Sequence, residues 1–321
     1  MLITRLGPDD LATTRFTVSP LWETVTSRWA MQDPARHAVH LPWIRNARQI
    51  DRSADFQQYR EVLDSLIRVG SWIPDFLTPP PDDGPPDFHA ELTALAETPL
   101  DQMRADLAET QSRTPLQGLG RQFLEEPERY LPELVEALNA WWTLAIEPSW
   151  PQLRAVLEAD IAERSRTLAE HGPARMFGEL HPSLRWRDGV LEMENRCELD
   201  FASTATDAGL PMAPSVFLAG PPAFFVRPGE PLFMWYAIEV PATFWRGGPS
   251  PQLVQLMGDA RARLLAVLDE PRTADEVASR LGLSMREVTA DLLVLQEAGL
   301  LVSHNDSYAR TELGRSLSNL S

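Results

Sequence analysis

The chain has 321 residues, of which 44% are hydrophobic and 23% are charged, and its formal net charge is −17. The length allows two domains with separate cores, and the acidic balance disfavours non-specific binding to anionic membranes or nucleic acid. No apolar run approaches the roughly 18 residues that a membrane span needs. The single cysteine, Cys197, excludes an internal disulfide and is typical of a reducing cytoplasm, where we expect the protein to be.

The first 170 residues are predicted to be mostly helical. Residues 1–10 are strand-like, with a possible edge strand at 2–6, and do not have the pattern of a signal peptide. Residues 41–44 are expected to form an apolar turn, and the proline-rich segment 78–87 an exposed loop. Helices are expected to begin at Pro8 and Pro20 and to cover 55–69, 88–97, 100–110, 127–146 and 151–170. The short connection between the last two predicts an antiparallel pair.

The pattern changes after residue 174, where strands become the expected element. Asp188-Gly189 lies between two strand-like runs and is a strong signal for a β-hairpin. Further short strands are predicted at 199–201, 215–218, 223–226 and 232–237. We therefore expect a large domain, 1–245, that is helical and ends in a small antiparallel sheet. A linker rich in glycine and proline follows it.

The large domain offers few residues with the spacing of a chemical site. His37 and His40 could share a metal on a helix, but no third ligand lies near them in sequence. Glu192, Glu194, Glu198 and Asp200 alternate, which is more typical of a solvated sheet face than of a catalytic carboxylate pair. Phosphate-binding loops, nucleophile elbows and zinc patterns are absent from the sequence. We expect no enzyme activity, no cofactor and no metal.

Tryptophan is the residue type that suggests a ligand site. All ten tryptophans precede residue 246, and the candidates for an aromatic pocket are Trp43, Trp72, Trp141 and Trp142. Such a pocket would bind an apolar or aromatic small molecule. The alternative is that these side chains fill the core, and the sequence leaves both interpretations open.

Residues 252–321 predict a second domain, a winged helix-turn-helix. Thr273 and Glu276 begin one helix, Ser284 and Glu287 begin the next, and both pairs have the spacing of a capping box. Strands at 300–302 and 308–310 and a final helix at 312–320 complete the pattern. The second helix is the one that enters the DNA major groove in such domains. The predicted contacts to bases or phosphates are Arg280, Ser284, Met285, Arg286, Thr289, Ala290, Arg310 and Arg315.

This segment resembles the ArsR-like winged-helix regulators of bacteria. The resemblance is carried by RARLLAVL (261–268), TADEVA (273–278), LGLS (281–284), Val288, Thr289, Leu292, Leu295, AGL (298–300) and YARTELG (308–314). The earlier part resembles the uncharacterised domain that precedes such a winged helix in some long regulators, at FTVSPLWE (16–23), HLPW (40–43), IPDFL (73–77) and GLPMAPSVF (209–217).

The resemblance implies a transcriptional regulator whose large domain senses something, without indicating what. Together with the symmetry of operator DNA it also implies a homodimer on that DNA, and we expect the signal to be a small-molecule ligand of the large domain. The predicted fold class is α+β, mostly α. An alternative comes from the charge of the second domain, which has seven arginines, ten acidic residues and a net charge of −3. Glu287, Asp291 and Asp306, together with a short wing, would suit a domain that has lost DNA and binds a basic protein or peptide.

Overall fold

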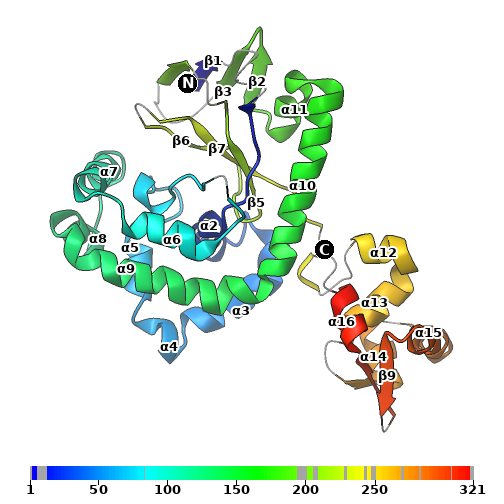
Figure 1. Ribbon diagram of the computed structural model, residues 1–321. Coiled ribbons are helices and arrows are strands. Elements are labelled where there is room, and N and C mark those ends of the chain that lie inside the picture. The colour runs from blue at the N-terminus through cyan, green and yellow to red at the C-terminus, as the bar shows by residue number, and fades with distance from the viewer. Residues whose placement is uncertain are drawn as a thin grey trace. The chain divides into compact units, whose positions relative to one another are not determined.

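The computed structural model describes residues 2–5, 13–82, 84–193, 201–204, 209–227, 230–241, 244–246, 251–268, 271–281, 283–304 and 306–318. The chain divides into two units, Met1–Glu239 and Val240–Ser321, which are coloured blue to yellow and yellow to red in Figure 1. The described elements confirm a mostly helical α+β protein with a winged helix-turn-helix at its C-terminal end.

The large unit contains ten labelled helices and seven strands among its described residues. The helices are α2 (Pro20–Gln32), α3 (Leu41–Asp51), α4 (Ala54–Gln57), α5 (Arg60–Leu66), α6 (Phe88–Ala96), α7 (Leu100–Arg113), α8 (Leu119–Glu125), α9 (Pro127–Trp141), α10 (Trp150–His171) and α11 (Pro173–Leu180). The strands are β1 (Leu2–Arg5), β2 (Leu184–Arg187), β3 (Val190–Met193), β4 (Phe201–Thr204), β5 (Met212–Ser215), β6 (Ala223–Phe225) and β7 (Phe233–Ala237).

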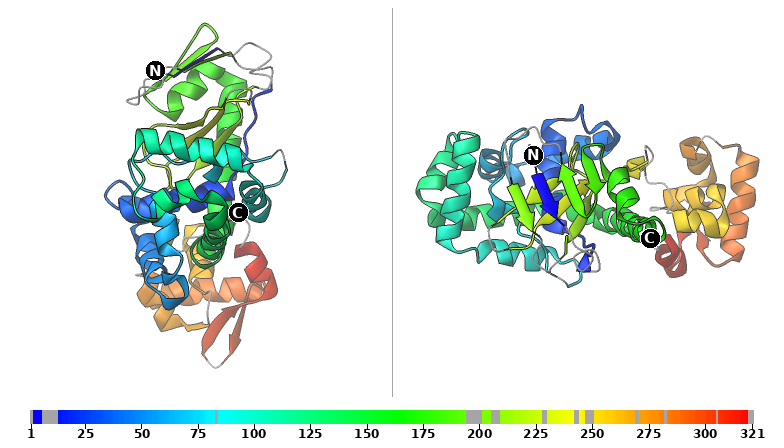
Figure 2. Two further views of the ribbon diagram at one scale, coloured as in Figure 1. Left: turned by 90° about the vertical axis from the view of Figure 1, so that its left-hand side faces the viewer. Right: turned by 90° about the horizontal axis from the view of Figure 1, so that it is seen from above.

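The strands of this unit form two small sheets, ordered β2-β3-β1-β4 and β5-β7-β6. Neighbouring strands are antiparallel except for the parallel pairs β1–β4 and β5–β7. The β2–β3 hairpin turns at Asp188 and Gly189, whose φ angles of 50° and 77° are those of a type I′ turn, as predicted. The four-stranded sheet lies at the end of the unit opposite α3 and α4 (Figures 1 and 2).

Strand β7 is apolar on both faces because both of its faces are covered. Met234 and Tyr236 pack in a core with α11 and the four-stranded sheet, and Phe233 and Trp235 pack on α2. The ring of Trp235 stacks on Trp22 of α2 at 4.2 Å between centroids. A strand buried on both faces loses the alternation of polar and apolar residues, so β7 connects these two clusters.

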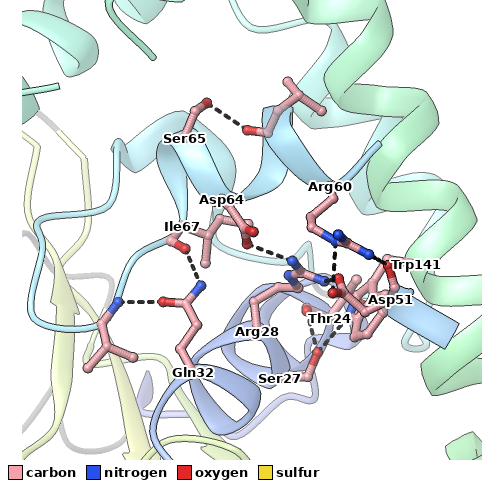
Figure 3. Close-up of polar contacts among 12 residues, drawn as sticks. Thr24, Ser27, Arg28, Gln32, Asp51, Arg60, Asp64, Ser65, Ile67 and Trp141 are labelled. Atoms are coloured by element: carbon pink, nitrogen blue, oxygen red, sulfur yellow. Dashed lines mark hydrogen bonds and ion pairs between the residues drawn. The ribbon is translucent and has the colours of Figure 1, made fainter. Parts of the chain in front are cut away.

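Helix α2 is surrounded by the rest of the unit. Ser19 caps its N-terminus by accepting a hydrogen bond from Trp22 N, and Pro20 occupies the first turn, as expected. Its polar side chains are buried as well, so each needs a partner. Figure 3 shows Arg28 directed toward Asp51 of α3, Asp64 of α5 and Trp141 of α9. This arginine joins four helices of the unit.

Several helix predictions are wrong in ways that tertiary packing explains. Residues 41–44 begin helix α3, because Pro42 suits a first turn and Trp43, Ile44 and Ala47 form a buried stripe. The long helix expected over 55–69 is two short ones, and Arg60 pairs with Asp51 of α3 where the second begins. The sequence prediction also missed α8.

The antiparallel pair expected from the two longest helices does not form. Helix α9 continues as a π-helical turn at Trp142–Ile146 before α10 begins. Figure 1 shows α10 leaving α9 at a steep angle and running along α11. Strand β1 is also internal in its sheet, whereas an edge strand was expected, and the strand expected at 215–218 is instead β5, which ends at Ser215. The helix expected at Pro8 lies outside the described residues.

The second unit has the winged helix-turn-helix order. Its elements are α12 (Pro251–Met257), α13 (Asp259–Val267), β8 (Arg272–Thr273), α14 (Ala274–Leu281), α15 (Met285–Glu297), β9 (Leu301–His304), β10 (Ser307–Arg310) and α16 (Glu312–Ser318). The strands form an antiparallel sheet ordered β8-β10-β9. One core joins the three main helices of the unit through Leu265 of α13, Val277 of α14, and Val288 and Leu292 of α15. This packing fixes which face of α15 is directed away from the core.

Candidate nucleic-acid interface

Helix α15 begins with a complete capping box, as predicted. Ser284 Oγ accepts a hydrogen bond from Glu287 N at 3.3 Å, and Glu287 Oε2 accepts one from Ser284 N at 3.0 Å. Such a cap stabilises a helix by about 1 kcal/mol. The hydrogen bonds from Ser284 hold the pKa of Glu287 below its ordinary value. The carboxylate of Glu287 and the hydroxyl of Ser284 therefore serve the helix itself, which makes Ser284 a poor candidate for reading bases.

The two faces of α15 have opposite environments. Val288, Leu292 and Leu295 are buried at helical spacing. Arg286, Thr289 and Ala290 are exposed on the other face, and Met285 is 42% exposed at its start. The structure thus brings these four predicted contact residues onto one accessible surface. Leu293 and Val294 extend this surface and were missed, because an apolar residue in a helical pattern is normally assigned to the core.

Three of the predicted arginines have guanidinium groups without a hydrogen bond or close ion pair to another described residue. They are Arg280 of α14, Arg286 of α15 and Arg315 of α16, and all three are exposed. Arg280 interacts with Glu276 of the same helix only through its charge. A guanidinium with all of its donors available suits a phosphate or the edge of a guanine. These side chains place positive charge on the surface of an otherwise acidic unit.

The prediction that Arg310 contacts phosphate needs correction, because its guanidinium group is bonded within the unit. Its Nε donates to the carbonyl oxygen of Leu265 at 2.8 Å, and its Nη2 donates to that of Ala266 at 2.6 Å. These carbonyls belong to the last turn of α13, where helical oxygens lack partners. Arg272 similarly donates to the carbonyl oxygen of Val267. Both arginines therefore cap α13 from the sheet, a role that no spacing in the sequence indicates.

The acidic residue in the middle of α15 is paired with an arginine. Asp291 Oδ1 lies 2.9 Å from Arg261 Nε of α13, and the Asp291 side chain is only 20% exposed. Together with the cap at Glu287, this pair accounts for both acidic side chains between Met285 and Glu297. The exposed face of the helix thus presents Arg286 without a carboxylate from Glu287 or Asp291 competing for it.

The four tryptophans proposed for ligand binding do not form a common pocket. Trp43 and Trp141 are buried, and their Nε1 atoms donate to Ala145 O and Ser27 Oγ. Trp142 is buried and stacks on Phe88 at 4.4 Å. Trp72 lies elsewhere, with the guanidinium of Arg113 at 4.1 Å from its ring. The core interpretation therefore fits Trp43, Trp141 and Trp142, because all three are buried and each contacts other side chains or backbone of the unit.

The histidine pair also lies in the core. The ring nitrogens of His37 lie 2.8 Å from the carbonyl oxygen of Asp33 and 3.0 Å from that of Phe217. Burial and the neighbouring His37 lower the pKa of His40 to about 4. Within the described ranges, no group of three His, Cys, Asp or Glu side chains could hold a metal ion. Glu194, Glu198 and Asp200 lie outside those ranges.

A family model described as a helix-turn-helix domain matches residues 257–304. The match covers α13, α14, α15 and β9 and includes the exposed Arg280 and Arg286, whereas Arg315 of α16 lies beyond it. No curated protein and no solved structure matches the chain. None of the helices in the described part is long and apolar enough to cross a membrane.

Proposed function

We propose that this protein is a DNA-binding transcriptional regulator of the ArsR-like winged-helix type. The observation that carries the proposal is the composition of the α15 surface. It combines exposed Arg286 with small side chains at Thr289 and Ala290, and the acidic residues nearest to them on the helix, Glu287 and Asp291, have partners within the unit. Arginine suits guanine in the major groove, and methyl groups of threonine and alanine suit thymine. The helix-turn-helix match over the same elements supports this assignment.

The proposal extends to a homodimer in the cytoplasm whose large unit binds a small ligand. Winged helices of this kind read two half-sites about one helical turn apart, so two copies would dock together. The two most exposed large apolar side chains in the described part are Leu256 of α12 and Leu313 of α16, at 67% and 54%. They supply apolar surface for such pairing. Light scattering of the purified protein measures the oligomeric state directly.

The direct test is binding of the purified chain to DNA from upstream of its own gene, followed by fluorescence anisotropy. We expect specific binding that weakens steeply with salt. Each neutralised phosphate lowers the logarithm of the association constant by about 0.9 for every tenfold rise in salt concentration. Arg286→Ala should weaken binding by about tenfold or more, since one good base or phosphate contact contributes roughly 1–3 kcal/mol.

Arg263→Ala is the matched control for this variant. Arg263 is also exposed but lies on α13, where it pairs with Asp259 at 3.5 Å. The Arg263→Ala substitution removes the same unit of charge without changing the α15 surface. Equal affinities of both folded variants for DNA would refute docking through α15.

The peptide-binding alternative is less supported by the geometry. Two of the three acidic residues that motivated it, Glu287 and Asp291, have partners within the unit. A folded protein that fails to bind its upstream DNA at low salt, with and without candidate ligands, would favour the peptide-binding alternative.

A further inference from the structure

A pocket of about 260 Å³ lies beside the proline-rich segment of the large unit. Proline rings between residues 79 and 86 form one wall, and Thr17 and Val18, just before α2, form another. The third wall is a stripe of α6 at helical spacing, Ala90, Glu91 and Ala94, continued by Asp87 at its N-cap. The volume is just below the roughly 300–1,000 Å³ of pockets that hold drug-sized ligands, so this pocket would hold a small molecule.

Glu91 is the polar side chain buried in this wall, with only 7% of its surface exposed. Its Oε2 accepts hydrogen bonds from Ser19 Oγ at 2.7 Å and from Leu21 N at 3.0 Å. Both donors belong to the N-terminus of α2, where backbone N–H groups lack helical partners. Oε1 accepts no hydrogen bond from any described residue. One carboxyl oxygen thus holds α2, and the other remains for whatever occupies the pocket.

The charges around Glu91 all have the same sign. The other ionisable residues of the wall are Asp82 and Asp87, and neither arginine nor histidine is among the described lining residues. Asp87 Oδ1 is used by the backbone N–H groups of His89 and Ala90. Burial, with added repulsion from Asp87 and Asp82, raises the pKa of Glu91 to about 8. A positive charge in the pocket would remove this penalty, because it supplies the counter-charge that the protein lacks.

We propose that this pocket binds a small organic ammonium ion, with its charged nitrogen against Glu91 Oε1 and its apolar part against the proline rings. At neutral pH the empty site keeps a proton on Glu91. Binding of the cation ionises the carboxyl group, and the proton is released to the buffer. A neutral molecule of the same shape lacks this interaction, and an anion is repelled by the carboxyl groups.

The site also suggests how a ligand could reach the core. Glu91 bonds to the first turn of α2, and α2 carries Glu23 and Arg28 into the centre of the unit. In the regulator proposed above, the ammonium ion is then the effector class that the large unit recognises. This regulatory role rests on the proposed function, whereas binding in the pocket does not.

Isothermal titration calorimetry of the full chain tests the site, with butylammonium as probe and with butan-1-ol and butyrate as its neutral and anionic counterparts. We expect butylammonium to bind at least about tenfold more tightly than either, as a charge-assisted hydrogen bond requires. Its affinity should rise with pH up to about 8, and its binding enthalpy should depend on the ionisation enthalpy of the buffer, because Glu91 releases its proton.

Variants identify the carboxyl group. Glu91→Gln should reduce butylammonium affinity at least about tenfold, whereas Glu97→Gln, which changes an exposed residue at the end of the same helix, should not change it. Ala94→Leu places a larger side chain in the pocket while the Glu91 carboxyl group remains, and it should also abolish binding, which keeps the test valid if Glu91→Gln fails to fold. Equal binding of the three probes, or binding unaffected by Ala94→Leu, would overturn the site.

DNA anisotropy with and without butylammonium separates the two proposals. A change in DNA affinity supports the effector role. Binding of the cation without such a change refutes that role and leaves the site in place. A chain that binds the cation but no DNA contradicts the proposed function alone.

Discussion

Replacing Arg28 by methionine should destabilise the large unit more than any exposed arginine substitution. Arg28 is 1% exposed, and its guanidinium contacts Asp51 Oδ1 at 2.7 Å and Asp64 Oδ1 at 2.6 Å. The same group lies 4.6 Å from the ring centre of Trp141. Methionine keeps much of the apolar volume and removes the charge, so the variant isolates the electrostatic and hydrogen-bonding contributions.

The expected loss follows from what the variant leaves behind. Removing one partner of a buried ion pair costs about 3–5 kcal/mol, and a desolvated cation–π contact contributes about 1–2 kcal/mol more. Two features reduce the first value here. Asp51 keeps Arg60, at 2.9 Å, and the Asp64 side chain is 43% exposed and can be hydrated. We therefore expect the free energy of unfolding to fall by about 3 kcal/mol.

Urea unfolding followed by tryptophan fluorescence measures this loss in the large unit, because nine of the ten tryptophans precede residue 240. The matched control is Arg166→Met, whose side chain is 61% exposed and pairs with Glu163. An exposed pair of this kind contributes about 0–1 kcal/mol. If both variants lose the same amount, Arg28 does not hold the four helices together as described.

Two further predictions concern a close backbone approach and a buried carboxyl group. Gly314→Ala should lower the melting temperature measured by circular dichroism, since its Cβ would lie 2.2 Å from Leu300 O, a backbone atom. Gly178→Ala, with open space around its Cβ, should not lower it. Burial raises the pKa of Glu23 from 4.5 to about 7, so the folded protein keeps a proton that the unfolded chain has lost. Stability should therefore fall as pH rises from about 4.5 to about 7. Glu23→Gln should flatten this dependence in urea unfolding at pH 5 and pH 8, and an unchanged slope would contradict the assignment.

Local hydrogen bonding explains which parts of the fold could be read from the residues. The capping boxes at Thr273–Glu276 and Ser284–Glu287 join groups three residues apart. The turn at Asp188 and Gly189 depends on two adjacent residues that tolerate positive φ angles. Such signals need no knowledge of distant chain segments, so the helix-turn-helix and the hairpin were predicted correctly. Apolar spacing likewise predicts a buried stripe on α15 at Met285, Val288, Leu292, Leu295 and Ala298. Val288, Leu292 and Leu295 are buried, whereas Met285 and Ala298 at the two ends are exposed.

Burial and long-range pairing decided the rest. Arg310 bonds to carbonyls 44 and 45 residues earlier in the chain, so its exposure and its role could not be inferred from its place in the wing. The tryptophans had the composition of either a pocket or a core, and only their packing partners distinguish the two. Glu91 shows no pattern in the sequence, because its partners Ser19 and Leu21 are 72 and 70 residues away. The sequence by itself determined where helix α15 begins and which of its faces is buried, because both depend on interactions within one or two helical turns. The tertiary structure alone decided which charged groups remain available, because availability depends on partners that folding brings together.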